Sequence, residues 1–280
     1  MNSSKRFALL SIICTLLMLT GARCVSAQSV KFPHGTLSLV TEKTWIEPGR
    51  EFTVGAHFAL EPGWHIYWVN PGDSGEPPKF TWKLPLGFSA REAQWPAPRR
   101  LGSATVADFG YDRDVTLLIP MKASANATAS GAASLEASVR LLICREMCIP
   151  GKTTATISVP LKNGAAPPDK TGGALINAAR MQLPEKMPAS WRATANATKD
   201  SFVLKVQGSG KLDGAKFFPL TPSQVDNVAP QQFATSNGGF ELTLKKSEEL
   251  EKPIARLKGV LETLDGKAYA IDAAVTSGAH

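Results

Sequence analysis

Apolar side chains recur at every second position along much of this chain, and this pattern restricts the fold more than any other feature. In the segment 51–58, Phe52, Val54, Ala56 and Phe58 are separated by single residues, and Pro-Gly pairs interrupt the pattern on both sides. Successive side chains of a β-strand point to opposite faces of a sheet, so this period predicts a strand. Four further runs of this kind are KFTWKL (79–84), VTLLIPM (115–121), SLEASVRLLI (134–143) and TTATISVPL (153–161).

The sequence predicts an all-β protein of two β-sandwich domains, because about 250 residues exceed what one small β-domain uses. Seven or more short strands between Gly/Pro turns predict an immunoglobulin-like sandwich over residues 28–161. The Pro-, Gly- and Ala-rich stretch KNGAAPPDKTGG and the amphipathic ALINAARMQLP predict a linker and short helix over residues 162–184. Strands return from Trp191 onward, so residues 185–280 are predicted to form the second β-sandwich domain.

Residues 1–27 have the layout of a secretory signal peptide. Lys5 and Arg6 precede an apolar stretch over residues 7–19, and the small-x-small triplet 25–27 predicts cleavage after Ala27. No later segment approaches the roughly 20 apolar residues that a membrane-spanning helix needs. We therefore expect an exported, soluble protein of the periplasm that is not embedded in the membrane.

Charge and cysteine content narrow the function. Removal of the signal peptide lowers the formal net charge from +7 to +4, and without a long basic run this gives no case for nucleic-acid binding. It also removes Cys14 and Cys24 and leaves Cys144 and Cys148. In an oxidising compartment two thiols this close are expected to form a disulfide unless another protein reduces them.

The spacing of Cys144 and Cys148 predicts a hairpin. Residues four apart on one strand lie about 13 Å from each other, whereas a disulfide needs Cα atoms within about 7 Å. The segments before and after the pair both look like strands, so the cysteines are expected to flank a tight three-residue turn. Such a small ring tends to be strained, exposed and easily reduced. Within the turn, Arg145 favours a thiolate and Glu146 opposes it.

Three interpretations of the pair remain open from the residues alone. The first is a structural disulfide, which is common in exported proteins. The second is a Cu(I) site, because Cys144, Met147 and Cys148 offer soft sulfur ligands. The third is thiol–disulfide exchange with another protein.

Three separated motifs resemble one family. They are LEPGWHIYWVNPGDSGEPPKFTWKLP, YDRDVTLLIPM and LLICREMCIPGK, and in this order they resemble the N-terminal periplasmic domain of the DsbD and ScsB membrane thiol–disulfide reductases. The resemblance covers about residues 32–161, and the helix and second β-domain look like the extension of the ScsB-like branch. It implies an immunoglobulin-like domain that accepts electrons through a cysteine pair and passes them to periplasmic partners, with no cofactor.

The resemblance also implies roles for individual residues. Cys144 and Cys148 match the redox pair, and by analogy Cys148, beside Ile149 and Pro150, is expected to be less free, which favours Cys144 as the attacking cysteine. Tyr67 and His65 lie where the family places side chains beside the site.

Some members of the family shield the pair with an acidic and aromatic cap loop. The corresponding stretch here, WPAPRRLGSATVADFGYD, is basic in its first half, and the resemblance leaves Asp108, Phe109 and Tyr111 as candidates for a cap.

The reductases of this family continue into a membrane domain and a thioredoxin-like domain, whereas this sequence ends at His280. We therefore expect a monomeric electron shuttle between a membrane thiol–disulfide reductase and periplasmic thioredoxin-like proteins, and the sequence leaves open whether it is itself an enzyme, such as a protein-disulfide reductase. Cytochrome c maturation and copper tolerance are the settings that the resemblance implies. The alternatives are a non-catalytic protein-binding module with a structural disulfide and a Cu(I)-binding protein.

Overall fold

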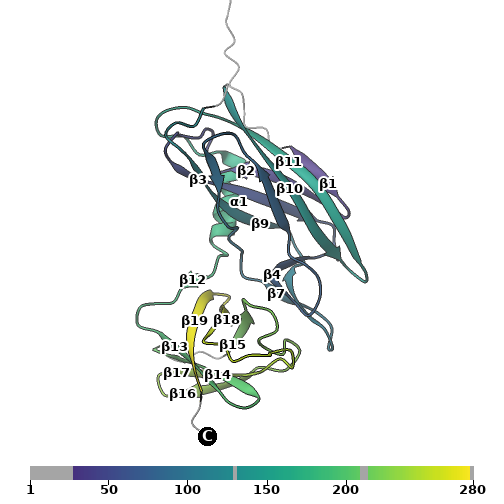
Figure 1. Ribbon diagram of the computed structural model, residues 1–280, viewed down its shortest axis with the longest axis vertical. Coiled ribbons are helices and arrows are strands. Elements are labelled where there is room, and N and C mark those ends of the chain that lie inside the picture. Colours follow the sequence, from purple (N-terminus) through teal and green to yellow (C-terminus); the bar gives the residue numbers. More distant parts are fainter. Residues whose placement is uncertain (1–27, 129–130, 209–213, 278–280) are drawn as a thin grey trace, which may run out of the picture.

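The computed structural model describes residues 28–128, 131–208 and 214–277 (Figure 1). The predicted signal peptide, residues 1–27, lies outside the described residues. Within them, nineteen strands accompany a single helix, and the strands form two domains. The predicted all-β class with two β-domains is therefore confirmed.

Two sheets build the body of the first domain. The larger has the strand order β1-β2-β3-β9-β6 and the smaller the order β11-β10-β5. The strands of the larger sheet are β1 (Ser29–Phe32), β2 (Gly35–Thr41), β3 (Glu51–Leu60), β9 (Val115–Ala123) and β6 (Phe88–Ala90). Those of the smaller sheet are β11 (Cys148–Pro160), β10 (Ala132–Cys144) and β5 (Lys79–Lys83).

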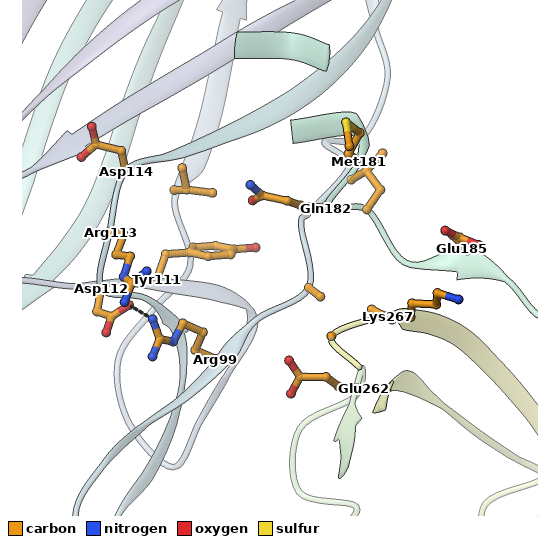
Figure 2. Close-up of a pocket in the computed structure, with 15 residues that line it drawn as sticks. Arg99, Tyr111, Asp112, Arg113, Asp114, Met181, Gln182, Glu185, Glu262 and Lys267 are labelled. Atoms are coloured by element: carbon orange, nitrogen blue, oxygen red, sulfur yellow. Dashed lines mark ion pairs between the residues drawn. The ribbon is translucent and has the colours of Figure 1, made fainter. Parts of the chain in front are cut away.

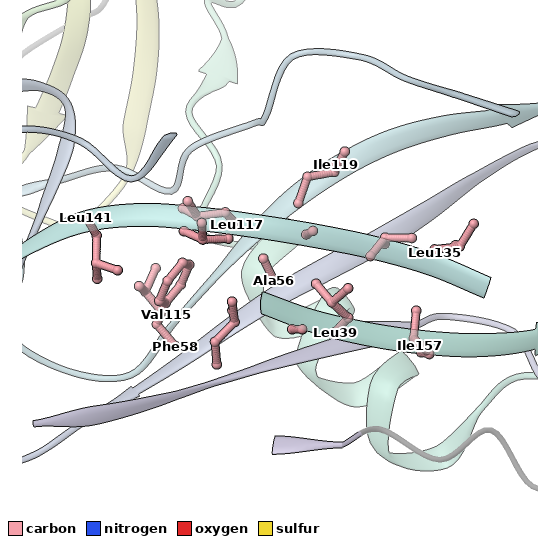
Figure 3. Packing of buried hydrophobic residues seen from close by; sticks show 14 of the residues in the cluster. Leu39, Ala56, Phe58, Val115, Leu117, Ile119, Leu135, Leu141 and Ile157 are labelled. Carbon is pink, nitrogen blue, oxygen red and sulfur yellow. The ribbon is translucent and has the colours of Figure 1, made fainter. Parts of the chain in front are cut away.

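The core of the first domain lies between these two sheets. Figure 3 shows Leu39 of β2 and Phe58 of β3 on one side, and Leu135 of β10 and Ile157 of β11 on the other. All four side chains are fully buried. The alternating residues that predicted the strands are therefore the residues that meet between the sheets, as expected for two stacked sheets that each present one apolar face.

A third, smaller sheet closes the end of the first domain that faces the second domain (Figure 1). Its strands are β4 (Ile66–Gly72), β8 (Ala107–Tyr111) and β7 (Arg99–Gly102). The pairing of β4 with β8 shifts register between Tyr67 and Gly72, which marks a bulge. Bulges redirect side chains and are common beside functional sites.

The helix α1 (Lys170–Arg180) covers the outer face of the larger sheet. Ile176 of the helix packs in one buried cluster with Val40 and Leu118, which point away from the main core. This cover explains why β9 is buried at five consecutive positions instead of at every second one. The helix begins at Lys170 because Asp169 caps it, accepting a hydrogen bond of 2.7 Å from the Gly172 N–H.

The second domain builds its core from one eight-stranded sheet. Seven strands follow the order β15 (Ala215–Pro219), β18 (Arg256–Thr263), β19 (Ala268–Ser277), β13 (Arg192–Ala197), β14 (Ser201–Gln207), β17 (Gly239–Lys245) and β16 (Gln232–Ser236), while β12 (Glu185–Lys186) pairs with β19. Phe217 of β15, Phe202 of β14 and Phe240 of β17 meet in one buried cluster, so the sheet folds over and encloses its own apolar face.

The two domains share apolar contacts. Phe218 and Val260 of the second domain belong to the main buried cluster of the first. The ring of Phe218 packs edge-on against Phe109 of β8, with ring centroids 5.2 Å apart. Among the described residues, no helix is long and apolar enough to cross a membrane.

Loss of the helix cap is expected to weaken the packing of α1 on the larger sheet. Replacement Asp169→Ala leaves the Gly172 N–H without its acceptor and should lower the free energy of unfolding by about 1 kcal/mol. Asp169→Asn keeps a side-chain oxygen at the same place and should cost less. Urea unfolding of both variants measures the difference, and equal destabilisation would show that the capping hydrogen bond is not the cause.

Candidate functional site

The two cysteines lie opposite each other at the tip of a hairpin. Strands β10 and β11 pair antiparallel from Ala132 and Pro160 to Cys144 and Cys148, which are themselves direct partners. Their Cα atoms are 4.1 Å apart and a disulfide joins their sulfurs. The predicted three-residue turn between two strands is confirmed, and residues 145–147 form it.

The two cysteines differ in exposure. Cys144 is only 3% exposed, and its backbone N–H and C=O both pair with the backbone of His65, at 3.0 and 2.9 Å. Cys148 begins the strand β11 and is exposed. The expectation that Cys148 is the less free of the two is therefore wrong, because the chain before β4 covers the end of β10 and leaves the start of β11 open.

Tyr67 is the side chain that contacts both sulfurs. Its hydroxyl donates a hydrogen bond of 2.9 Å to the Cys144 Sγ and lies 3.4 Å from the Cys148 Sγ. The residue is 1% exposed, and this burial is the main reason why the pKa of Tyr67 is raised. The charge of Asp108 also raises this pKa, whereas the contact with Ser74 lowers it. Tyr67 therefore remains a neutral hydrogen-bond donor.

His65 lies beside Tyr67 with its ring edge-on, at a centroid distance of 5.3 Å. Burial lowers the pKa of His65, while the charges of Asp108 and Asp112 raise it by less. Its Nε2 atom is buried and has no hydrogen-bond partner among the residues that the structure describes. The ring is therefore uncharged at neutral pH, and it contributes bulk beside Tyr67 instead of a positive charge beside the sulfurs.

The turn residues direct their side chains outward. Arg145 is exposed, and its guanidinium carbon lies over the ring of Trp64, 5.2 Å from the centroid. The His34 ring stacks on the same indole at 3.7 Å. Glu146 is exposed, and Met147 is 69% exposed. The positive charge of Arg145 is therefore engaged by an aromatic face, a contact that holds the turn to the body of the domain.

Of the three candidates for a cap, Phe109 and Tyr111 make their contacts away from the sulfurs, whereas Asp108 lies close enough to Tyr67 and His65 for its charge to raise the pKa of both. Phe109 packs against Phe218 of the second domain. The hydroxyl of Tyr111, whose pKa burial raises well above its usual value, donates to the Pro96 carbonyl at 2.8 Å. Asp108 accepts hydrogen bonds from the backbone N–H and the hydroxyl of Ser74, at 3.1 and 2.8 Å.

Tyr111 instead lines a pocket of about 390 Å³ between the two domains (Figure 2). Side chains of both signs surround this pocket, and Arg99 and Asp112 form an ion pair of 3.3 Å in it. Neither cysteine lines the pocket. It is therefore separate from the disulfide.

The segment that lies over Tyr67 is residues 72–75, which we call the site loop. A Cβ atom on Gly75 would lie 2.1 Å from the Tyr67 Cζ, so only glycine permits this approach to the ring. Gly75 also has φ +81°. Sequence reasoning did not single out this loop, although its two glycines and the Asp-Ser between them are typical of a tight turn.

Within the described parts of the chain, no three or more His, Cys, Asp and Glu side chains gather as a metal site would require. In the oxidised pair both sulfurs are bonded to each other, so the sulfur set of Cys144, Met147 and Cys148 offers no thiolate in this state.

Comparisons with known proteins identify a matching family and a solved structure of similar fold. Residues 38–160 match the family described as thiol:disulfide interchange protein DsbD, N-terminal. Among curated proteins, no sequence matches. The crystal structure of the N-terminal periplasmic domain of ScsB from Proteus mirabilis matches with a TM-score of 0.67 and 18% identity, over 90% of this chain and 98% of that chain. At this identity the likeness concerns the fold alone.

Loss of the Tyr67 hydroxyl should make the reduced pair more basic. A hydrogen bond to a charged group contributes about 1.5–3 kcal/mol, so Tyr67→Phe is expected to raise the first apparent pKa of the dithiol by about one unit or more. The measurement is the rate of alkylation of the reduced protein as a function of pH.

Tyr111→Phe is the matched control, because it removes another buried hydroxyl whose partner is the Pro96 carbonyl and not a sulfur. Superimposable profiles of wild type and Tyr67→Phe would contradict a role of the hydroxyl in thiolate stabilisation.

Proposed function

Because residues 38–160 belong to the family of DsbD N-terminal domains, we propose that this protein is a periplasmic thiol–disulfide exchange module. In this proposal the Cys144–Cys148 pair relays electrons between a membrane reductase and periplasmic thioredoxin-like proteins. The observation that carries it is the unequal environment of the two sulfurs. One is open to a partner and the other is buried, and a single neutral donor reaches both.

Reduction of a partner begins at the exposed sulfur. The Cys148 thiolate attacks one sulfur of the partner's disulfide, the partner's other sulfur leaves as a thiolate and takes up a proton, and a mixed disulfide remains. The Cys144 thiolate then attacks the Cys148 sulfur and releases the second partner thiol. The partner gains two electrons and two protons, and the Cys144–Cys148 bond is restored.

Reduction of the Cys144–Cys148 disulfide by the membrane reductase takes the same steps in reverse. One thiolate of the membrane reductase's dithiol attacks the exposed Cys148 sulfur, and Cys144 leaves as a thiolate and takes up a proton. The second thiolate of the reductase then attacks the reductase sulfur in this mixed disulfide, so Cys148 leaves as a thiolate and takes up a proton. The reductase is left with a disulfide, and the pair has gained two electrons and two protons. The Tyr67 hydroxyl already lies 2.9 Å from the Cys144 Sγ, so it is placed to stabilise the negative charge that develops there. Because Tyr67 is neutral and fixed by burial, this stabilisation needs no reorganisation of charged side chains.

The periplasmic location is part of the proposal. It is supported by the predicted signal peptide and by the likeness of the fold to the N-terminal periplasmic domain of ScsB. A compartment without a strongly reducing thiol pool would keep the pair oxidised until a specific donor reduces it.

The reduction potential of the pair is the first quantity to measure. We expect a value in the range of exchange proteins, roughly −120 to −270 mV, when the purified protein is equilibrated with glutathione or dithiothreitol buffers of known potential. A potential below about −300 mV would mark the disulfide as a structural bond and overturn the proposal.

Single cysteine variants should trap partners unequally. Cys144→Ser keeps the exposed Cys148 but lacks the resolving thiol, so mixed disulfides should accumulate in periplasmic extracts as bands that disappear on reduction. Cys148→Ser keeps only the buried Cys144 and should trap much less, and the double variant should trap nothing. Equal trapping by both single variants, or by neither, would contradict Cys148 as the attacking residue.

A further inference from the structure

Asn70 links the second domain to the start of the site loop. This side chain is fully buried, and its Nδ2 donates a hydrogen bond of 2.7 Å to the backbone carbonyl of Pro219 in the second domain. Its Oδ1 accepts a hydrogen bond of 3.1 Å from the Gly72 N–H, the first residue of the site loop. The Asn70 amide therefore joins two backbone segments. Because the side chain is buried, the loss of either hydrogen bond would leave a polar atom unpaired and would cost stability.

Asp73, inside the site loop, makes a second connection. Its Oδ1 accepts a hydrogen bond of 2.8 Å from the Asn227 Nδ2 of the second domain, and its Oδ2 accepts one of 2.7 Å from the Ala107 N–H of β8. Arg100 of β7 holds the same segment of the second domain, donating to the Asn227 carbonyl at 3.2 Å. Both carboxylate oxygens of Asp73 are therefore occupied, one within the first domain and one across the interface.

The loop held in this way reaches the sulfurs through one side chain. Ser74 is fixed to Asp108 by two hydrogen bonds, and Gly75 lies against the ring of Tyr67. The Tyr67 hydroxyl in turn contacts both sulfurs. An unbroken series of contacts therefore runs from Pro219 and Asn227 to the disulfide.

We propose that the second domain is a working part of the redox site, in which Asn227 is a positioning residue that holds the site loop over Tyr67. When this contact is lost, the loop loosens, Tyr67 moves away from Cys144, and the buried thiol becomes more accessible and more basic. The inference deepens the proposed function, since it assigns a role to the second domain in the chemistry of the pair.

An exchange of amide and carboxylate across the interface tests the contact directly. Asn227→Asp places two carboxylates opposite each other and should open the loop. The double variant Asp73→Asn with Asn227→Asp restores the pair, because an asparagine at position 73 can still accept from the Ala107 N–H and can donate to the new carboxylate. Asp73→Asn alone is less informative. The Asn227 amide can rotate and accept a hydrogen bond from the new asparagine amide, so the contact can persist.

The readout is the alkylation of Cys144 by iodoacetamide in a Cys148→Ser background, followed as a function of pH. Asn227→Asp should increase the rate several-fold at high pH and shift the apparent thiol pKa upward, and the double variant should return both toward the parent. Asn227→Ala, which adds no charge, should change the alkylation rate and the apparent thiol pKa in the same direction. This variant replaces Asn227→Asp in the test if Asn227→Asp does not fold. Asn196→Asp, the same change at an exposed position of β13, should change neither.

The proposal is overturned if Asn227→Asp and Asn227→Ala leave the rate and the pH profile unchanged while they lower the unfolding midpoint, which would mean that the contact only holds the domains together. Failure of the double variant to restore the parent profile would overturn it as well. Alkylation requires no partner protein, so these outcomes are independent of the reduction potential and the trapping experiments.

Discussion

The pairing of β10 with β11 is the constraint on which the site depends. The ladder continues without a break from Ala132 and Pro160 to the two cysteines, and the turn beyond it has only three residues. Antiparallel pairing places the last residues of the two strands side by side, so the disulfide needs no further adjustment of the chain. The same pairing carries alternate residues of both strands into the core, and this burial fixes the register.

Strand β4 connects this hairpin to the rest of the molecule. Its residue Tyr67 contacts the sulfurs, while its neighbour Asn70 is committed to the second domain. The register shift between Tyr67 and Gly72 interrupts the regular pairing of β4 with β8. It therefore allows Tyr67 to face the sulfurs while Asn70 faces the second domain. The site loop begins at Gly72, the last residue of β4, so the contacts with the second domain and the contact with Tyr67 act on the same short segment.

The electrostatics of the site differ from what the neighbouring residues in the sequence imply. Arg145 and Glu146 lie between the cysteines in the chain, yet Arg145 stacks on Trp64 and Glu146 is exposed to solvent. The group that reaches both sulfurs is the neutral hydroxyl of Tyr67, whose pKa burial raises. A buried neutral donor is less screened by salt than an exposed charge.

The sequence alone determined the two-domain all-β class, the strands with regular alternation and the hairpin, because these follow from local rules. Alternation such as that of Phe52 and Phe58 assigns faces, and the three-residue spacing of the cysteines excludes a continuous strand. It did not determine which sulfur is open, what covers Tyr67, or how the domains meet. Tyr67 and Cys144 are 77 positions apart, and Asn70 and Pro219 are 149 apart. Alternation at every second residue shows which residues share a face of a strand. It does not show which distant segment packs against that face, so only the tertiary structure could decide these contacts.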